Sequence, residues 1–212
     1  MLGAMESFGR EESNIVEGEI PFFVVYWKQV AAASAILLVL VIGSTLGFQV
    51  WKSQKDQKEL EASTALASAK DLKGREEAAQ KFLGSRQSAL ALLEIADDHV
   101  GVKEFDPARK AYETFLATYP HHALINAARL GLAGVLESQG KTEDAIKTYQ
   151  QAAQSSPQDV YGTVARLNLA RLYEAAKNYS AARQALEMVV AQAGQTRYAI
   201  EAKEKLKTLP KS

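Results

Sequence analysis

The stretch that decides the fold is NAARLGLAGVLESQGKTEDAIKTYQQAAQSSP, residues 126–157. Apolar residues recur in it at three- and four-residue spacing, for example at Leu132, Leu136 and Ile146, a pattern typical of amphipathic α-helices. Gly140 separates two such runs, and glycine commonly ends a helix. The stretch therefore predicts two helices joined by a short turn.

The same pattern occurs three times along the chain. Residues 89–120, 126–157 and 163–194 align without gaps at a spacing of 37 residues. Helical hairpins of this kind bury their apolar faces by stacking on one another, so we predict an all-α solenoid. Small residues recur at fixed positions, where we expect two helices to approach most closely. The positions that coincide are Ala96, Ala133 and Ala170; Ala108, Ala145 and Ala182; and Tyr112, Tyr149 and Leu186.

This pattern resembles the tetratricopeptide repeat. The first unit departs from the family pattern at Phe115, and the third has Leu186 in place of the aromatic residue. The family unit has about 34 residues, so the spacing of 37 implies a longer junction between units. In the middle unit the small, alanine, aromatic, alanine and proline positions of the signature are occupied by Ala133, Ala145, Tyr149, Ala152 and Pro157.

The segments beside the repeats are also expected to be helical. Arg75–Ser85 resembles the second helix of a degenerate repeat, and Tyr198–Leu209 resembles a solvating helix that caps the stack. The predicted parts are a polar tail (1–20), an anchor (21–51), a helical stalk with the degenerate repeat (52–85), and tetratricopeptide-like repeats with the capping helix (86–212).

One long apolar segment precedes the repeats. The run Gln29–Trp51 carries no charge, and its 23 residues would extend roughly 34 Å as a helix, enough to cross a hydrocarbon core of about 30 Å. A buried core helix or a cleaved secretory signal would have a shorter apolar region. We therefore predict a single uncleaved transmembrane helix. Aromatic residues flank it, as at membrane interfaces: Phe22, Phe23, Tyr26, Trp27, Phe48 and Trp51.

The charges on either side of the apolar run predict which side of the membrane holds the repeats. Lys52, Lys55 and Lys58 follow the apolar run, whereas only Arg10 and Lys28 precede it. Positive residues favour the cytoplasmic side, so charge places the repeats in the cytoplasm, although long domains are translocated largely regardless of charge.

Composition excludes several classes of function. The chain has no cysteine and equal numbers of acidic and basic residues, 25 of each, so disulfides, thiol catalysis and a phosphate-binding basic tail are not expected. His99 is expected to be a hydrogen-bonded residue within a helix, and His121–His122 a polar turn. The pairs Asp97–Asp98 and Glu76–Glu77 are expected to be solvated surface. We therefore predict no catalytic residues, no metal site, no cofactor and no nucleic acid partner.

A binding groove is the function that the resemblance implies. In tetratricopeptide proteins the first helix of each pair lines a concave groove, and the leucines transferred to it here are equally consistent with simple core packing. The carboxylate clamp of cytosolic co-chaperones is not matched, because Leu93, Asp97, Gly131, Val164 and Asn168 occupy its places and only the last fits in type. The candidate groove residues are Leu93, Asp97, Leu130, Glu137, Leu167 and Arg171.

The order of parts resembles the YfgM family, bacterial membrane-anchored ancillary subunits of the SecYEG translocon that also associate with the periplasmic chaperone PpiD. This resemblance implies an inner-membrane protein with a cytoplasmic N-terminus and periplasmic repeats. It also implies a non-enzymatic scaffold whose partners are the translocon, a periplasmic chaperone and exported chains. An envelope-assembly or cell-division scaffold is the alternative. An enzyme or sensor with regulatory repeats is disfavoured, because the repeats occupy the remaining chain.

Overall fold

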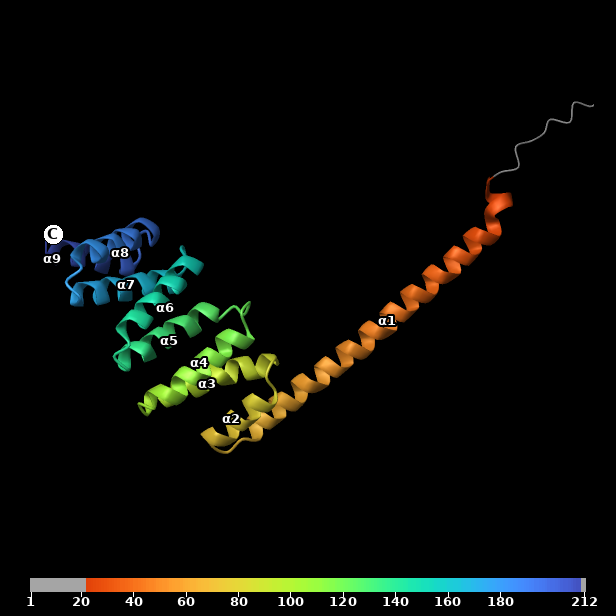
Figure 1. Cartoon of the computed structure of the whole chain (residues 1–212), viewed down its shortest axis with the longest axis horizontal. Helices are drawn as coiled ribbons and strands as arrows, with labels where there is room; N and C mark the ends of the chain where they lie inside the picture. Colours follow the sequence, from red (N-terminus) through yellow and green to blue (C-terminus); the bar gives the residue numbers. More distant parts are fainter. Residues whose placement is uncertain (1–21, 211–212) are drawn as a thin grey trace, which may run out of the picture. The chain divides into compact units, whose positions relative to one another are not determined.

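The computed structural model describes residues 22–210, which form helices joined by short turns and loops, with no strand among them. The predicted tail, Pro21 and the last two residues lie outside the described residues. The prediction of an all-α fold with one long apolar helix ahead of helical hairpins is confirmed (Figure 1). The helices are α1 (Phe22–Ser68), α2 (Leu72–Lys81), α3 (Arg86–Gly101), α4 (Phe105–Thr118), α5 (Ile125–Ser138), α6 (Thr142–Ser155), α7 (Val160–Ala175), α8 (Tyr179–Gln192) and α9 (Arg197–Thr208).

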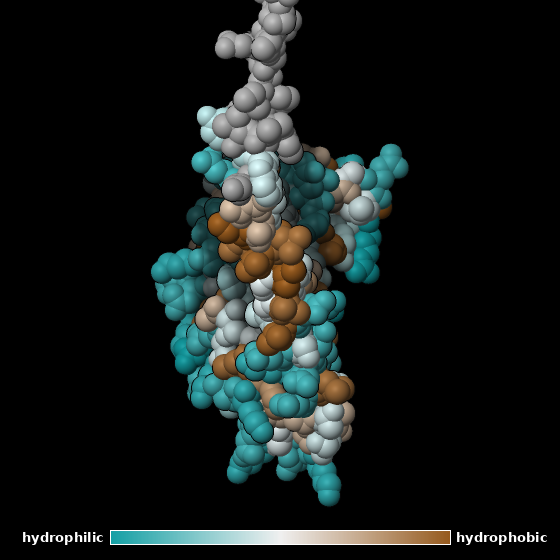
Figure 2. All heavy atoms as spheres, turned by 90° about the vertical axis from the view of Figure 1, so that its right-hand side faces the viewer, coloured by the Kyte–Doolittle hydropathy of each residue, from teal (hydrophilic) through white to brown (hydrophobic). Residues whose placement is uncertain are grey.

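The chain divides into two compact units, with the boundary between Gln54 and Lys55. The first contains the apolar part of α1, whose side chains from Ile36 to Ile42 are between 49% and 66% exposed. A window of mean hydropathy 2.3 lies in Gln29–Ser68, and none of it is buried. By length and composition this helix can cross a membrane. Figure 2 shows apolar residues as a brown strip in the centre of the view.

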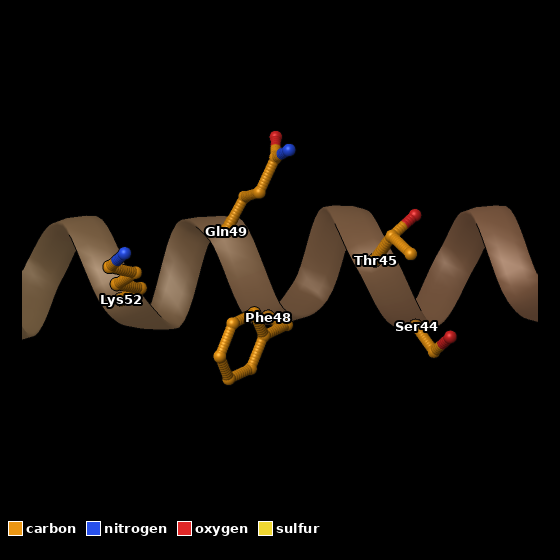
Figure 3. Close-up of a pocket in the computed structure, with 5 residues that line it drawn as sticks. All are labelled: Ser44, Thr45, Phe48, Gln49 and Lys52. Atoms are coloured by element: carbon orange, nitrogen blue, oxygen red, sulfur yellow. The ribbon is translucent and has the colours of Figure 1, made fainter.

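Hydroxyl groups within this apolar helix are satisfied by its own backbone. Ser44 Oγ donates to the Val41 carbonyl and Thr45 Oγ1 to the Ile42 carbonyl, both at 2.9 Å. A hollow beside α1 is lined by residues of this one helix, and Figure 3 shows Thr45 and Gln49 pointing away from Phe48. These side chains therefore form an open helix surface and do not enclose a ligand.

The second unit is built from three complete hairpins, α3–α4, α5–α6 and α7–α8. The alanines that coincide in the sequence alignment are fully buried or nearly so, with exposures between 0% and 2%. A larger side chain at these places would force the helices apart. The six residues are Ala96, Ala133, Ala170, Ala108, Ala145 and Ala182.

The turn inside each hairpin repeats its backbone geometry every 37 residues. Lys103, Gly140 and Lys177 adopt left-handed conformations with φ of 63°, 74° and 58°. The next amide in each turn donates back to the first helix over 2.8–2.9 Å, as Glu104 does to the His99 carbonyl. Asn178 follows the left-handed Lys177 and caps α8, where its side-chain oxygen accepts a hydrogen bond from the Ala181 amide at 3.2 Å. Gly101 ends α3, and the left-handed residue comes later.

The segment predicted as a degenerate repeat contains α2, and the end of α1 belongs to the same compact unit. Ala62 of α1 is fully buried, and Leu66 packs against the core of the repeats. The Glu59 carboxylate accepts a hydrogen bond from the Arg86 amide at 3.1 Å, so it caps the start of α3. At the other end of the stack, α9 buries Ala202 against the repeats. The core of the second unit thus extends from α1 to α9.

Candidate partner-binding face

The first helices of the three hairpins form the inner side of the stack. The Cα atoms of α5 approach those of α3 and α7 within 8 Å. Among the described helices, the second helices α4 and α6, and likewise α6 and α8, do not contact one another in this way. Closer spacing on one side means that the stack curves toward α3, α5 and α7. We call the exposed side of these three helices the inner face.

Three leucines recur on the inner face. Leu93, Leu130 and Leu167 are half-buried, and each packs against the hydrophobic core while part of its side chain remains accessible. Leu90, three residues before Leu93 and therefore on the same side of α3, is 44% exposed. The leucines thus contribute to the core and also present apolar surface on three neighbouring helices.

Asp97 on the inner face accepts a hydrogen bond from the hydroxyl of Tyr112, which lies on α4. Burial and the neighbouring Asp97 raise the pKa of Tyr112, so the hydroxyl stays protonated. A Cβ atom built on Gly131 of α5 would lie 2.3 Å from Cζ of Tyr112. The tyrosine ring therefore occupies the space of a side chain at Gly131 and links two successive hairpins.

Glu137 and Arg171 form a bidentate ion pair between α5 and α7. Arg171 Nη1 donates to Glu137 Oε1 at 2.7 Å, and Nη2 donates to Oε2 at 2.6 Å. The side chains are 28% and 46% exposed, so the pair stabilises the fold by only about 1 kcal/mol or less. Burial, with the nearby Glu137 charge, raises the pKa of Tyr149 to about 12. Because Arg171 and Glu137 are already bonded to each other, a partner would meet them as one ion pair and not as two separate charges.

The structure also explains why a carboxylate clamp does not form on this face. Gly131 is covered by the Tyr112 ring, and the amide group of Asn168 donates to the Val164 carbonyl of its own helix at 3.1 Å. Asn168, which fits the clamp in type, is thus already engaged within its own helix.

Sequence reasoning missed the role of Arg166. Its side chain is 5% exposed and donates to the carbonyl oxygens of Ala153 (2.8 Å) and Pro157 (3.1 Å) at the end of α6. Burial lowers its pKa, and the charge of Asp159 opposes this effect. An arginine within an apolar helical run was the only indication in the sequence. The contact ties α7 to the preceding hairpin.

The histidines are integrated into the fold. His99 is buried and hydrogen-bonded, whereas the ring of His122 stacks edge-on against Phe115 at 5.3 Å and accepts from the Leu124 amide. Glu76 and Asp98 have side chains that are 42% and 45% exposed, and each also forms an ion pair at 2.5 Å, Glu76 with His99 and Asp98 with Arg75. No cluster of three or more potential metal ligands occurs within residues 22–210.

The repeat architecture agrees with comparisons to known proteins. A model described as a tetratricopeptide repeat-like domain matches residues 25–156, more than half of the chain. The chain belongs to this family. A second family model, described as a tetratricopeptide repeat, matches residues 136–206. A search of curated proteins found no match.

Solved structures of other proteins share the fold of the tetratricopeptide repeat-like chain. A structure of the kinesin light chain nearly identical tetratricopeptide-like repeats from Podosopora anserina has 17% identity to this chain and a TM-score of 0.54, over 74% of this chain and 83% of that one. The CopN–Scc3 complex gives 16% identity and a TM-score of 0.52, over 72% and 97%. BtubC from P. vanneervenii gives 14% and 0.52, over 71% and 65%. The solenoid prediction is confirmed, and a repeat of this kind generally mediates protein–protein interaction without catalysis.

Proposed function

We propose that this protein is a membrane-tethered scaffold that binds other proteins on its inner face. The observation that carries the proposal is the recurrence of Leu93, Leu130 and Leu167 in one register on three neighbouring helices, each with accessible apolar surface. Apolar groups gathered on one side of a curved stack offer a partner desolvated contacts, which dominate protein–protein affinity.

The exposed apolar helix α1 supports attachment to a membrane. From the resemblance to the YfgM family we propose a bacterial inner-membrane protein with its N-terminus in the cytoplasm and its repeats in the periplasm. Lys52, Lys55 and Lys58 favour the opposite orientation. A reporter enzyme fused after Ser212 tests the topology: activity of a periplasm-only reporter is expected, and activity of a cytoplasm-only reporter alone would refute it.

The same resemblance supports the proposed partners, which are a SecYEG-type translocon, a periplasmic chaperone and exported chains. Purification of the full chain in mild detergent, followed by identification of bound subunits, tests this assignment. Recovery of translocon or chaperone subunits is expected. Recovery of envelope-assembly or division proteins in their place would favour the alternative scaffold function.

Substitutions on the inner face test where partners bind. Leu130→Asp and Leu167→Asp are expected to abolish partner recovery while the repeats still unfold cooperatively. Because both leucines also touch the core, Leu90→Asp is the cleaner change: Leu90 is 44% exposed on the same face. Ile200→Asp on α9 is the matched control, since Ile200 is 59% exposed. Equal partner recovery by the Leu90→Asp and Ile200→Asp variants would argue against the inner face.

A further inference from the structure

A charged cluster joins α2 to the first complete hairpin. His99 lies on α3 and its side chain is 7% exposed. Its Nε2 lies 2.5 Å from Oε1 of Glu76 on α2, and its Nδ1 lies 2.7 Å from Oε2 of Glu104 in the turn before α4. One buried ring therefore contacts carboxylates from two separate parts of the chain.

The protonation state of His99 determines whether both contacts are favourable. A neutral imidazole carries one N–H and can donate to only one carboxylate, whereas an imidazolium ion donates from both ring nitrogens. If the ring were neutral, one carboxylate would face a nitrogen lone pair. The geometry with two carboxylates at hydrogen-bonding distance thus fits the protonated ring.

Other charges around His99 do not replace it. Arg75 of α2 pairs with Asp98, and the nearest carboxylates to Arg109 of α4 are Asp106 and Glu113, at 3.7 and 3.9 Å. Within the described part of the chain, the only ion pairs of Glu76 and Glu104 are those with His99. The other charged groups that line the same cleft as the ring are Glu77 and Lys81 of α2 and Lys110 of α4. The turn adds Lys103, and the two helices also carry Lys73 of α2 and Arg86, Glu94 and Asp97 of α3.

The position of the cluster gives it a structural consequence. Glu76 belongs to α2, which has only ten residues and presents a single buried residue, Ala79. Besides the His99 contact, α2 is joined to α3 by the Ser88 hydroxyl, which donates to the Ala79 carbonyl at 2.6 Å, and by the Arg75–Asp98 pair. A short helix with so little apolar burial depends strongly on its polar contacts.

We propose that protonated His99 is a pH-sensitive clasp that holds α2 against the first complete hairpin and releases it as the pH rises. The helix α2 lies in the segment predicted as a degenerate repeat, so the clasp controls how firmly this segment is attached to the hairpins. The helices α2 and α4 also form the walls of an open cleft of about 1120 Å³, with Ile95 and His99 at its floor. Release of α2 would remove one wall of that cleft.

The direction of the pH effect follows from the ring's surroundings. Burial lowers the pKa of His99, but the hydrogen bonds and charges of Glu76 and Glu104 outweigh burial, so the pKa lies above its usual value. A group whose pKa is raised by folding contributes its full stability below the unfolded pKa, about 6.5 for histidine. That contribution is lost as the pH rises through the folded pKa.

Hydrogen exchange of the full chain in detergent tests the proposal. Protection factors of the α2 amides, corrected for intrinsic exchange, are expected to fall as the pH is raised through the folded pKa of His99, while those of α5 stay constant. His99→Gln should remove this pH dependence, and His121→Gln, which changes an exposed histidine, should leave it intact. An α2 profile that is the same in wild type and His99→Gln would overturn the proposal.

A second measurement covers the case in which His99→Gln does not fold. The ring of His99 is titrated by NMR in the wild-type chain and in Glu76→Gln and Glu104→Gln. Each substitution is expected to lower the pKa of His99, because it removes one negative partner. An unchanged pKa in both variants would show that neither carboxylate holds the proton, and would overturn the proposal independently.

Discussion

Exchanging residues at the three left-handed turn positions tests the account of the repeat geometry. Lys103 and Lys177 have φ of 63° and 58°, and Gly140 has φ of 74°. A residue with a side chain lowers the free energy of unfolding by about 1–2 kcal/mol when it adopts this conformation. Glycine lowers it by about 0.5–1 kcal/mol, because its backbone loses more conformational entropy on folding. The free energy of unfolding is therefore expected to rise by about 0.5–1 kcal/mol in Lys103→Gly or Lys177→Gly, and to fall by a similar amount in Gly140→Ala.

Thermal unfolding of the full chain in mild detergent, followed by far-UV circular dichroism, measures these changes. For a unit of this size, 1 kcal/mol shifts the Tm by about 2–4 °C. We therefore expect Lys103→Gly to raise the Tm by about 1–4 °C and Gly140→Ala to lower it by a comparable amount. The double variant Lys103→Gly, Lys177→Gly should show the sum, because the two turns lie in different hairpins.

Gly101 supplies the control for this experiment. It ends α3 without a positive φ, and nothing lies within 4 Å of a Cβ built on it. Gly101→Ala is expected to leave stability unchanged or to raise it by up to about 1 kcal/mol. The reasoning is refuted if Gly140→Ala is as stable as the wild type, or if Lys103→Gly is less stable.

Two further predictions concern contacts between hairpins. Gly131→Ala should lower the unfolding free energy in urea by about 1–3 kcal/mol, because the new methyl group overlaps the Tyr112 ring; wild-type stability of this variant would contradict the packing account. Arg166→Ala should cost about 2–3 kcal/mol in the same assay, because the carbonyls of Ala153 and Pro157 lose charged donors. Arg166→Lys should recover only part of this loss, since lysine lacks the planar two-donor fork, and full recovery would contradict that role.

Features with local causes were predictable from the sequence. The spacing of apolar residues and the coincident alanines predict helical hairpins because both follow from the helical period and from the space between packed helices. The fully buried Ala96, Ala133 and Ala145 confirm that part of the prediction. The length and lack of charge of Gln29–Trp51 likewise predict the long apolar helix.

Features that depend on residues far apart in the chain were not predictable in this way. The left-handed conformation of Lys103 was not predicted, because lysine is an unusual residue in that conformation. Glu76 and His99 are 23 residues apart, and nothing in the helical period of either segment indicates that they meet. The candidate groove residues were chosen singly, whereas Glu137 and Arg171 contact each other.

The sequence by itself determined the helical repeat, its register and the long apolar helix. Each of these depends on side chains within one or two helical turns, or on the recurrence of those side chains at a constant interval. Only the tertiary structure decided which side of the stack is the inner face, which charges are paired and how α2 is attached. These properties depend on the curvature of the stack and on contacts between separate helices, such as those of Tyr112 with Gly131 and of His99 with Glu76. Sequence periodicity carries no information about either.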